Sequence, residues 1–191
     1  MTIMFSSDTI CYFNAGSSDT AELLGNYLSK ILIKNGFSDI APVLLCIGSD
    51  RVTGDSLGPF VGTLLLKSQP ALPVLGTLTD PVHALNLRDT LCFLSEKFSG
   101  HPVVAIDASL GSRMHQEFLT IGSGSLEPGA GVDKILGSAG DLFITGIVAP
   151  TGPLPQLNLQ TVRLSLVMRF AECIAKAVIS CCPYKEPFLK A

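Results

Sequence analysis

Short apolar runs alternate with longer amphipathic stretches along this chain. The apolar runs have the length of buried strands and lie at residues 42–47, 74–77, 103–106, 118–121 and 142–148. Apolar residues at helical spacing predict a first helix between a Ser17-Ser18-Asp19 cap and an Asn35-Gly36 stop, and further helices at residues 55–67, 84–98 and 157–180. Strands that alternate with helices favour parallel pairing. The pattern therefore predicts an α/β fold, a three-layer α/β/α sandwich with a mostly parallel central sheet.

The chain shows no repeat and no linker, so its 191 residues predict one domain spanning 1–191. Residues 1–16 are expected to be weakly ordered or to form a sheet edge. A long Gly-rich loop is expected at 122–140. The last predicted helix is apolar over most of its circumference, which indicates burial on more than one side.

The composition narrows the choice of partners. Hydrophobic residues make up 47% of the chain and charged residues 15%, so either the sheet is covered on both faces or apolar surface is buried against another chain, which leaves a homodimer open. The net charge of -3 provides no electrostatic reason to bind nucleic acid or an acidic membrane.

The chain also lacks the usual targeting signals. No signal peptide is visible, and no apolar run approaches the roughly 20 residues that a membrane span requires. The six cysteines are expected to be small hydrophobic residues in a reducing cytosol, which predicts a cytoplasmic protein.

Acidic side chains follow each of the first three predicted strands. Asp50 and Asp55 come after the first strand, Asp80 and His83 after the second, and Asp107 directly after the third. The carboxyl ends of parallel strands share one edge of a sheet, where α/β proteins bind their ligands. The sequence therefore predicts one crevice in which neighbouring acids share protons or bind a cation.

Most of these residues also have a purely structural interpretation. Asp55 is well placed to cap the second helix, Asp50 to close a turn, and Asp80 to cap the third helix. His83 is placed to hydrogen-bond its own loop. Asp107 has no helix to cap after a buried β-branched strand, so a functional role is favoured for it.

One tempting motif is not supported by the rest of the chain. The letters Gly54-Asp55-Ser56-Leu57 match the signature of a group of serine hydrolases, which need a His base late in the chain. The last histidine here is His115, and Ser56 falls inside the predicted helix start. A serine nucleophile is therefore not expected.

The chain resembles the YyaC sporulation proteins over residues 42 to 175. The opening motif of the resemblance reads Cys46-Ile47-Gly48-Ser49-Asp50-Arg51-Val52-Thr53-Gly54-Asp55-Ser56-Leu57-Gly58-Pro59. Further matching segments follow in order at 76–87, 105–108, 128–132, 144–148 and 163–168. That family is in turn similar to the spore germination protease, an aspartic endopeptidase, and to the hydrogenase maturation peptidases, which implies their sandwich fold.

The resemblance implies roles for two acids. Asp55, in Asp55-Ser56-Leu57-Gly58-Pro59, matches one essential Asp of the germination protease, and Asp107, in Ile106-Asp107-Ala108, matches the second. In the maturation peptidases an acid at each place helps hold nickel together with a later His. No His follows His115 here, so His83 is the residue left to substitute for that ligand.

These observations lead to one hypothesis and two alternatives. The leading hypothesis is a sporulation-associated peptidase in the forespore or mother-cell cytosol, in which Asp55 and Asp107 activate water to hydrolyse a protein or peptide substrate. The alternatives are a hydrolase in which Asp55, Asp107 and His83 bind a divalent metal, and a non-catalytic module that binds peptides as a scaffold.

The remaining candidate residues have supporting roles in the leading hypothesis. Asp50, Asp80 and His83 are expected to form the rim or second shell of the site. Gly129 and Gly131 are expected to allow close backbone approach to an extended substrate.

Overall fold

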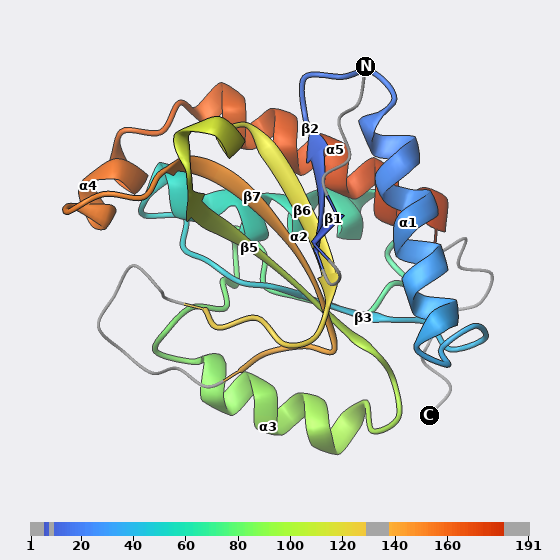
Figure 1. Cartoon of the computed structure of the whole chain (residues 1–191). Coiled ribbons are helices and arrows are strands. Elements are labelled where there is room, and N and C mark those ends of the chain that lie inside the picture. Colours follow the sequence, from blue (N-terminus) through green and yellow to red (C-terminus); the bar gives the residue numbers. More distant parts are fainter. Residues whose placement is uncertain (1–5, 8–9, 129–137, 182–191) are drawn as a thin grey trace.

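A mixed β-sheet forms the centre of the protein (Figure 1). The computed structural model describes residues 6–7, 10–128 and 138–181. Within these residues the sheet has seven strands, in the order β1-β2-β6-β7-β5-β3-β4. The strands are β1 (Ser6–Ser7), β2 (Ile10–Asn14), β3 (Val43–Cys46), β4 (Val74–Leu75), β5 (Val103–Gly111), β6 (Phe118–Ser123) and β7 (Leu142–Pro150).

The sheet has a parallel half and an antiparallel half. Strands β4, β3, β5 and β7 run parallel to one another, whereas the pairs β7–β6, β6–β2 and β2–β1 are antiparallel. The prediction of an α/β fold is confirmed, but the described sheet is mixed rather than mostly parallel. The sequence pattern missed this because the chain returns from β5 to β6 through a short turn, without a helical crossover.

Helices lie on both faces of this sheet (Figure 1). The helices are α1 (Thr20–Lys34), α2 (Leu57–Ser68), α3 (Leu87–Lys97), α4 (Pro155–Gln160) and α5 (Leu164–Cys181). Two short 3₁₀ helices, η1 (Thr53–Ser56) and η2 (Arg113–His115), complete the set in the described residues. Helices α1, α2 and α5 pack on one face, and α3 packs on the other.

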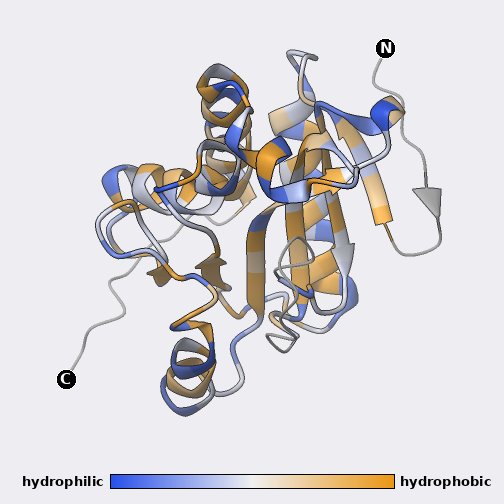
Figure 2. Cartoon of the chain, turned by 90° about the vertical axis from the view of Figure 1, so that its left-hand side faces the viewer, coloured by the Kyte–Doolittle hydropathy of each residue, from blue (hydrophilic) through white to orange (hydrophobic). Residues whose placement is uncertain are grey.

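The short central strand β3 has no exposed side. All four of its side chains have 0% exposure. Leu44 and Cys46 join the core beneath α1, α2 and α5, while Val43 and Leu45 join the smaller core beneath α3. Burial on both faces explains why this strand reads as an unbroken apolar run, and Figure 2 shows the same hydrophobic colouring along the central strands.

Two predicted elements have different bounds in the structure. The predicted helix 157–180 is two helices, because α4 ends at Gln160 and α5 begins at Leu164. Leu157 and Leu164 are about half exposed (50% and 49%), so the expected burial on several sides does not hold there. The predicted strand 103–106 continues to Gly111 as β5, because β7 still pairs with it after β3 has ended.

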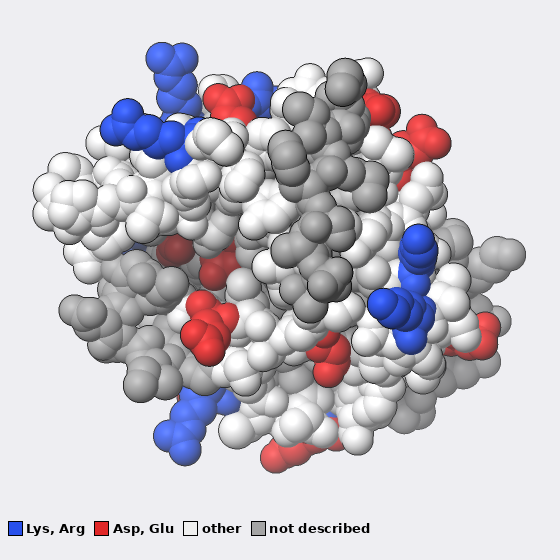
Figure 3. Space-filling view, viewed as in Figure 1, with Lys and Arg blue, Asp and Glu red and all other residues white. Residues whose placement is uncertain are grey.

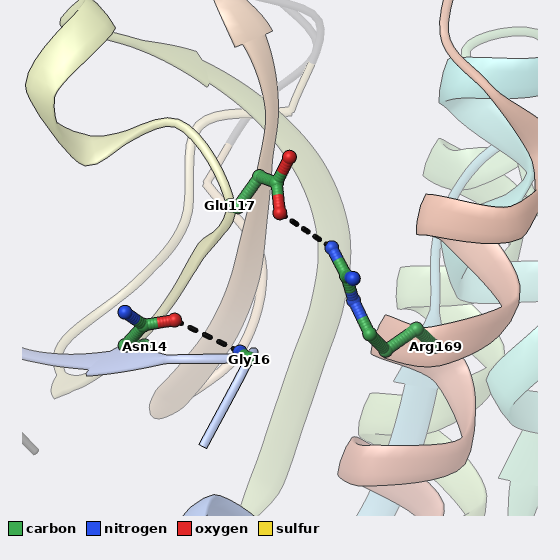
Figure 4. Close-up of polar contacts among 4 residues, drawn as sticks. All are labelled: Asn14, Gly16, Glu117 and Arg169. Carbon is green, nitrogen blue, oxygen red and sulfur yellow. Dashed lines mark hydrogen bonds and ion pairs between the residues drawn. The ribbon is translucent and has the colours of Figure 1, made fainter.

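Two polar contacts lie at the surface on the antiparallel side of the sheet (Figure 4). Arg169 of α5 donates a hydrogen bond to the Glu117 carboxylate just before β6 (2.5 Å), and Gly16 N–H donates to Asn14 Oδ1 after β2 (2.8 Å). Beneath them, Cys11 and Phe13 of β2 are buried in the main core. Exposed ion pairs stabilise little, so burial of β2 is the main anchor here. No helix among the described residues is long and apolar enough to cross a membrane.

Candidate active site

The loop after β3 is held closely against neighbouring backbone. The Ile47 N–H donates to the carbonyl oxygen of Ile106 in β5 (2.7 Å), and the Gly48 N–H donates to that of Val82 (2.8 Å). Gly48 has a φ of +141°, and a Cβ there would lie 2.0 Å from the backbone oxygen of Asp55. Only glycine fits this position, which brings the η1 helix directly against the end of β3.

Asp55 lies in η1 and is held by close backbone contacts. A Cβ on Gly58 would lie 2.1 Å from the carbonyl oxygen of Ile47, and one on Gly54 would lie 2.6 Å from that of Leu159 in α4. The residue before α2 is Ser56, and no side-chain capping bond forms there. Asp55 therefore does not cap α2, and its carboxyl group lines a cavity instead.

Asp107 lies inside β5, at the level where β3 ends. The last β3 residue, Cys46, pairs with Ile106, and Asp107 is opposite Thr145 of β7. Its side chain is buried (7% exposed), and its Oδ1 accepts a hydrogen bond from the Ala108 N–H (2.7 Å). Asp107 was expected to end its strand. It instead marks the point at which β5 loses one of its two neighbours.

Burial perturbs both carboxyl groups. Burial raises the pKa of Asp55 to about 6, while the Ser49 backbone N–H and the charge of His83 act to lower it. Burial, and then the negative charge of Asp55, raise the pKa of Asp107 well above its usual range. Both shifts disfavour the ionised form, and the Asp107 carboxyl group is the more deeply buried of the two.

The two acids share a cavity of about 600 Å³, within the size range of ligand sites. In the space-filling view of Figure 3, acidic side chains lie in and beside a hollow in the left half of the molecule. Asp55, Asp107 and Glu127 are its acidic lining residues, and no Lys or Arg lines it among the described residues. Apolar side chains, including Val52 and Leu159, form much of the remaining wall.

The other predicted residues lie around this pair in different ways. Asp50 is exposed in a turn, and Asp80 is exposed where its backbone closes a turn with Thr77. Neither is part of the cavity wall. Asp80 also does not cap α3, whose first residue follows Asn86. His83 is half-buried, and its charge acts to lower the pKa of Asp55.

Three further expectations concern the glycines, Ser56 and a metal. Gly129 and Gly131 lie outside the described residues. Ser56 is 3% exposed and donates its hydroxyl hydrogen to the Thr53 carbonyl oxygen (2.7 Å). A buried and hydrogen-bonded hydroxyl group is unsuitable as a nucleophile.

Across the residues that the structure describes, no group of three or more His, Cys, Asp or Glu side chains is arranged to hold a metal ion. Asp55, Asp107 and His83 therefore do not fit a three-ligand metal centre.

Sequence reasoning missed the wall that α4 contributes to the cavity. Gln156, Leu159 and Gln160 lie on this wall, but the helical spacing of 157–180 concealed the break that separates α4 from α5. Pro155, which begins α4, was the available signal, because proline is favoured at the first turn of a helix.

A row of hydroxyl groups beside Asp107 was missed as well. Thr145 is opposite Asp107, and its hydroxyl contacts those of Ser109 (3.1 Å) and Thr120 (2.6 Å). Single Ser and Thr residues within apolar strands gave no signal, since their alignment depends on the strand register.

Comparison with known proteins places the chain in a family. Residues 12–177 match the family described as "Protein of unknown function (DUF1256)". The chain belongs to this family. It is also 41% identical over 168 residues to "Uncharacterized protein YyaC" of Bacillus subtilis (strain 168), a match that covers 87% of this chain and 81% of that protein. The predicted YyaC-type resemblance is confirmed, and the matched region contains both Asp55 and Asp107.

Proposed function

We propose that this member of the family is a peptidase in which Asp55 and Asp107 activate water. The observation that carries the proposal is that Asp55 and Asp107 line one cavity and that burial raises the pKa of both carboxyl groups. A pair in which one acid is ionised and its neighbour is protonated is what acid–base hydrolysis of a peptide bond requires.

The two acids have different roles in this proposal. Ionised Asp55 takes a proton from water as the water oxygen attacks the peptide carbonyl carbon. Asp107 donates its proton to the carbonyl oxygen, which gives a tetrahedral gem-diol. The proton held by Asp55 then passes to the leaving nitrogen as the C–N bond breaks, and the Asp107 carboxylate takes back a proton from a hydroxyl of the gem-diol. The products are a carboxylic acid and an amine, and both side chains return to their starting forms. The Ala108 N–H bond to Oδ1 of Asp107 supports this role, because it leaves Oδ2 to carry the acidic proton.

The wider biological assignment belongs to the same proposal. The motifs around Asp55 and Asp107 resemble those of the spore germination protease and, more distantly, the hydrogenase maturation peptidases. We therefore propose a peptidase-type three-layer α/β/α sandwich, which the helices on both sheet faces support. We also propose a role in sporulation, in the cytosol of the forespore or mother cell, with a protein or peptide substrate. Nucleic acid and membranes are not among the proposed partners.

A hydrolysis experiment tests the catalytic proposal. The purified protein is incubated in H₂¹⁸O with peptides from a denatured bacterial extract, and new carboxyl termini carrying ¹⁸O are identified by mass spectrometry. We expect cleavage by the wild-type protein and a loss of roughly 10²-fold or more for Asp55→Asn and Asp107→Asn. Asp50→Asn, the same change in an exposed turn outside the cavity, is expected to retain activity.

Two results would contradict the catalytic proposal. One is the absence of any hydrolysis by the wild-type protein, in which case peptide binding without turnover would favour a scaffold role. The other is full activity in the Asp107→Asn variant. Loss of activity in chelator that returns with a divalent cation would favour the metal-dependent alternative, which the described side chains do not support.

A further inference from the structure

Strand β5 is much longer than its neighbour β3. Four residues of β3 pair with Val103–Ile106, and the Ile47 N–H makes the last bond on this side, to the carbonyl oxygen of Ile106 (2.7 Å). On its other side β5 stays paired with β7 as far as Gly111. Beyond Ile106, no strand within the described part of the chain pairs with the β3 side of β5.

The backbone bonds define which peptide groups face this open side. The carbonyl oxygens of Val103 and Gly111 accept bonds from residues that flank β7 (2.8 and 2.7 Å). Those of Pro102 and Ile106 accept bonds from the β3 side (2.8 and 2.7 Å). The β5–β7 register shifts between Ser109 and Leu110, but the Gly111 carbonyl still faces the β7 side after this shift. Because peptide groups alternate in direction along a strand, the even-numbered residues of β5 are expected to point toward the β3 side.

Ala108 and Leu110 are the even-numbered residues beyond the end of β3. Their peptide groups therefore point into the space that β3 would occupy if it were longer, and both residues line the cavity that holds the two acids. The Ala108 N–H is already bonded to the Asp107 carboxyl group (2.7 Å). Among the described residues, no turn or loop bonds to the Ala108 carbonyl or to the backbone groups of Leu110, so these groups are available to a partner on this side.

The exposure of β5 changes at the same point. Its residues are buried from Val104 to Asp107 and half-buried from Ala108 to Gly111. A strand edge with free donors and acceptors is a template for pairing with another chain. Here the edge is short, lies inside a cavity and is next to Asp107. It is thus protected from sheet-to-sheet aggregation but open to a single extended segment.

We infer that the cavity holds its substrate as an added β-strand, an extended peptide hydrogen-bonded to the edge of β5 at Ala108 and Leu110. This inference rests on the proposed function, since it describes how the peptide reaches the acid pair. Asp107 bonds the Ala108 N–H on this same edge, so a peptide paired there lies beside the carboxyl group.

The lining of the cavity defines the chemistry of this peptide. Asp55, Asp107 and Glu127 are acidic, and the described lining residues include no Lys or Arg. A peptide with uncharged or basic side chains therefore fits better than an acidic one. Alternate side chains of the peptide meet apolar walls that include Val52 and Leu126. Recognition through the main chain gives affinity with little dependence on sequence.

Peptide binding is measured with the Asp55→Asn variant, in which hydrolysis is not expected. The probe is a hexapeptide with blocked termini, in which valine and threonine alternate between a lysine at each end. Its binding is measured by calorimetry. We expect the parent peptide to bind. Analogues N-methylated at every second amide are expected to bind as well, because the methylated edge can face away from β5. The fully N-methylated analogue is expected to lose binding.

Changes in the protein provide a matched test. Proline at Leu110 removes the N–H that strand alternation places on the cavity side, so Leu110→Pro is expected to weaken peptide binding about tenfold. Leu110→Ala keeps the N–H and is expected to bind more tightly than Leu110→Pro. Should Leu110→Pro fail to fold, hydrogen exchange of the unsubstituted protein replaces it. The Leu110 amide should exchange more slowly with saturating peptide, and the Ser109 amide, which faces β7, should not change.

The outcomes separate this inference from the proposed function. Equal binding of the parent and fully N-methylated peptides, no binding of the parent peptide, or an unchanged Leu110 amide would each overturn strand addition. The proposed hydrolysis of peptides by the wild-type protein would not be contradicted by any of those three results. Strand-like binding without hydrolysis by the wild-type protein would support this inference and overturn the catalytic role.

Discussion

Asp107 is an acid whose pKa the fold raises well above its usual range. Its side chain is 7% exposed, and burial and the charge of Asp55 both disfavour its ionisation. The folded protein therefore binds the Asp107 proton more tightly than the unfolded chain does, in which the pKa is close to 3.8. From this it follows that the free energy of unfolding decreases as the pH rises above about 4.

Replacing Asp107 with Asn is expected to stabilise the protein at high pH. The amide has no charge to desolvate, so the free energy of unfolding at pH 8 should rise. Near pH 3, where the wild-type carboxyl group is also neutral, the difference should disappear. Urea unfolding across this pH range measures it, with Asp50→Asn as the control. A variant that is less stable than the wild type at pH 8 would contradict this account.

His83 is expected to control the ionisation of Asp55. Its positive charge acts to lower the pKa of Asp55, so His83→Gln should raise that pKa above about 6. Carbon-13 NMR titration of the Asp55 carboxyl group measures the change. His101→Gln is the control, since that ring lies before β5 and contacts the Ala41 carbonyl oxygen (3.0 Å). An unchanged or lower pKa in His83→Gln would show that His83 has no such influence.

At the scale of single residues, the sequence could locate candidate acids but not predict how they are arranged. Asp107 was singled out by its place after a buried apolar run, and Asp55 by the family resemblance of its motif. Asp50 and Asp80 looked equivalent to them, and only the path of each turn leaves these two in solvent. The direction in which a loop residue points depends on backbone turns that residue types specify weakly.

At the scale of elements, Gly48 joins the end of β3 to η1. Gly48→Ala is expected to cost about 3 kcal/mol or more, because it adds a methyl group where Asp55 O would be 2.0 Å away and also requires a φ of +141°. Gly36→Ala is the matched control. Its φ is +85° but nothing lies within 4 Å of the added Cβ, so about 1 kcal/mol is expected. Equal losses in urea unfolding would show that the contact with Asp55 is unimportant.

Apolar pattern located the strands and helices well but not their ends. The run at 103–106 predicts a strand, yet β5 continues through polar Asp107 and Ser109 because β7 provides its bonds. Apolar periodicity also predicted a single helix where the structure has α4 and α5. Both errors have one origin, since hydropathy reports burial, while the length of an element depends on its hydrogen-bonding neighbours.

At the scale of the whole molecule, the α/β class could be predicted because helices and strands alternate over the middle of the chain. The antiparallel half could not, since β2 and β6 are distant in sequence and their pairing is a tertiary event. The same holds for the cavity. Its lining comes from residues after β3, from β5, from the segment after β6 and from α4.

Self-association is the expectation that belongs to this scale. Large apolar side chains on and beside α4 and α5 are exposed, among them Leu154 (60%), Leu157 (50%) and Met168 (44%). Together with the low content of charged residues they favour a homodimer through this surface. Sedimentation equilibrium should show dimers that Leu157→Lys weakens. Leu85→Lys, at an exposed position (81%) outside α4 and α5, should not weaken them. A wild-type protein that stays monomeric at all concentrations would refute the prediction.

The contact between Gly54 and Leu159 has a mechanical consequence. A Cβ on Gly54 would lie 2.6 Å from the backbone oxygen of Leu159, so η1 and α4 touch main chain to main chain, with no flexible side chain between them. Close-packed backbones transmit displacement rather than absorb it. A ligand that displaces α4 is therefore expected to displace the segment that carries Asp55 as well.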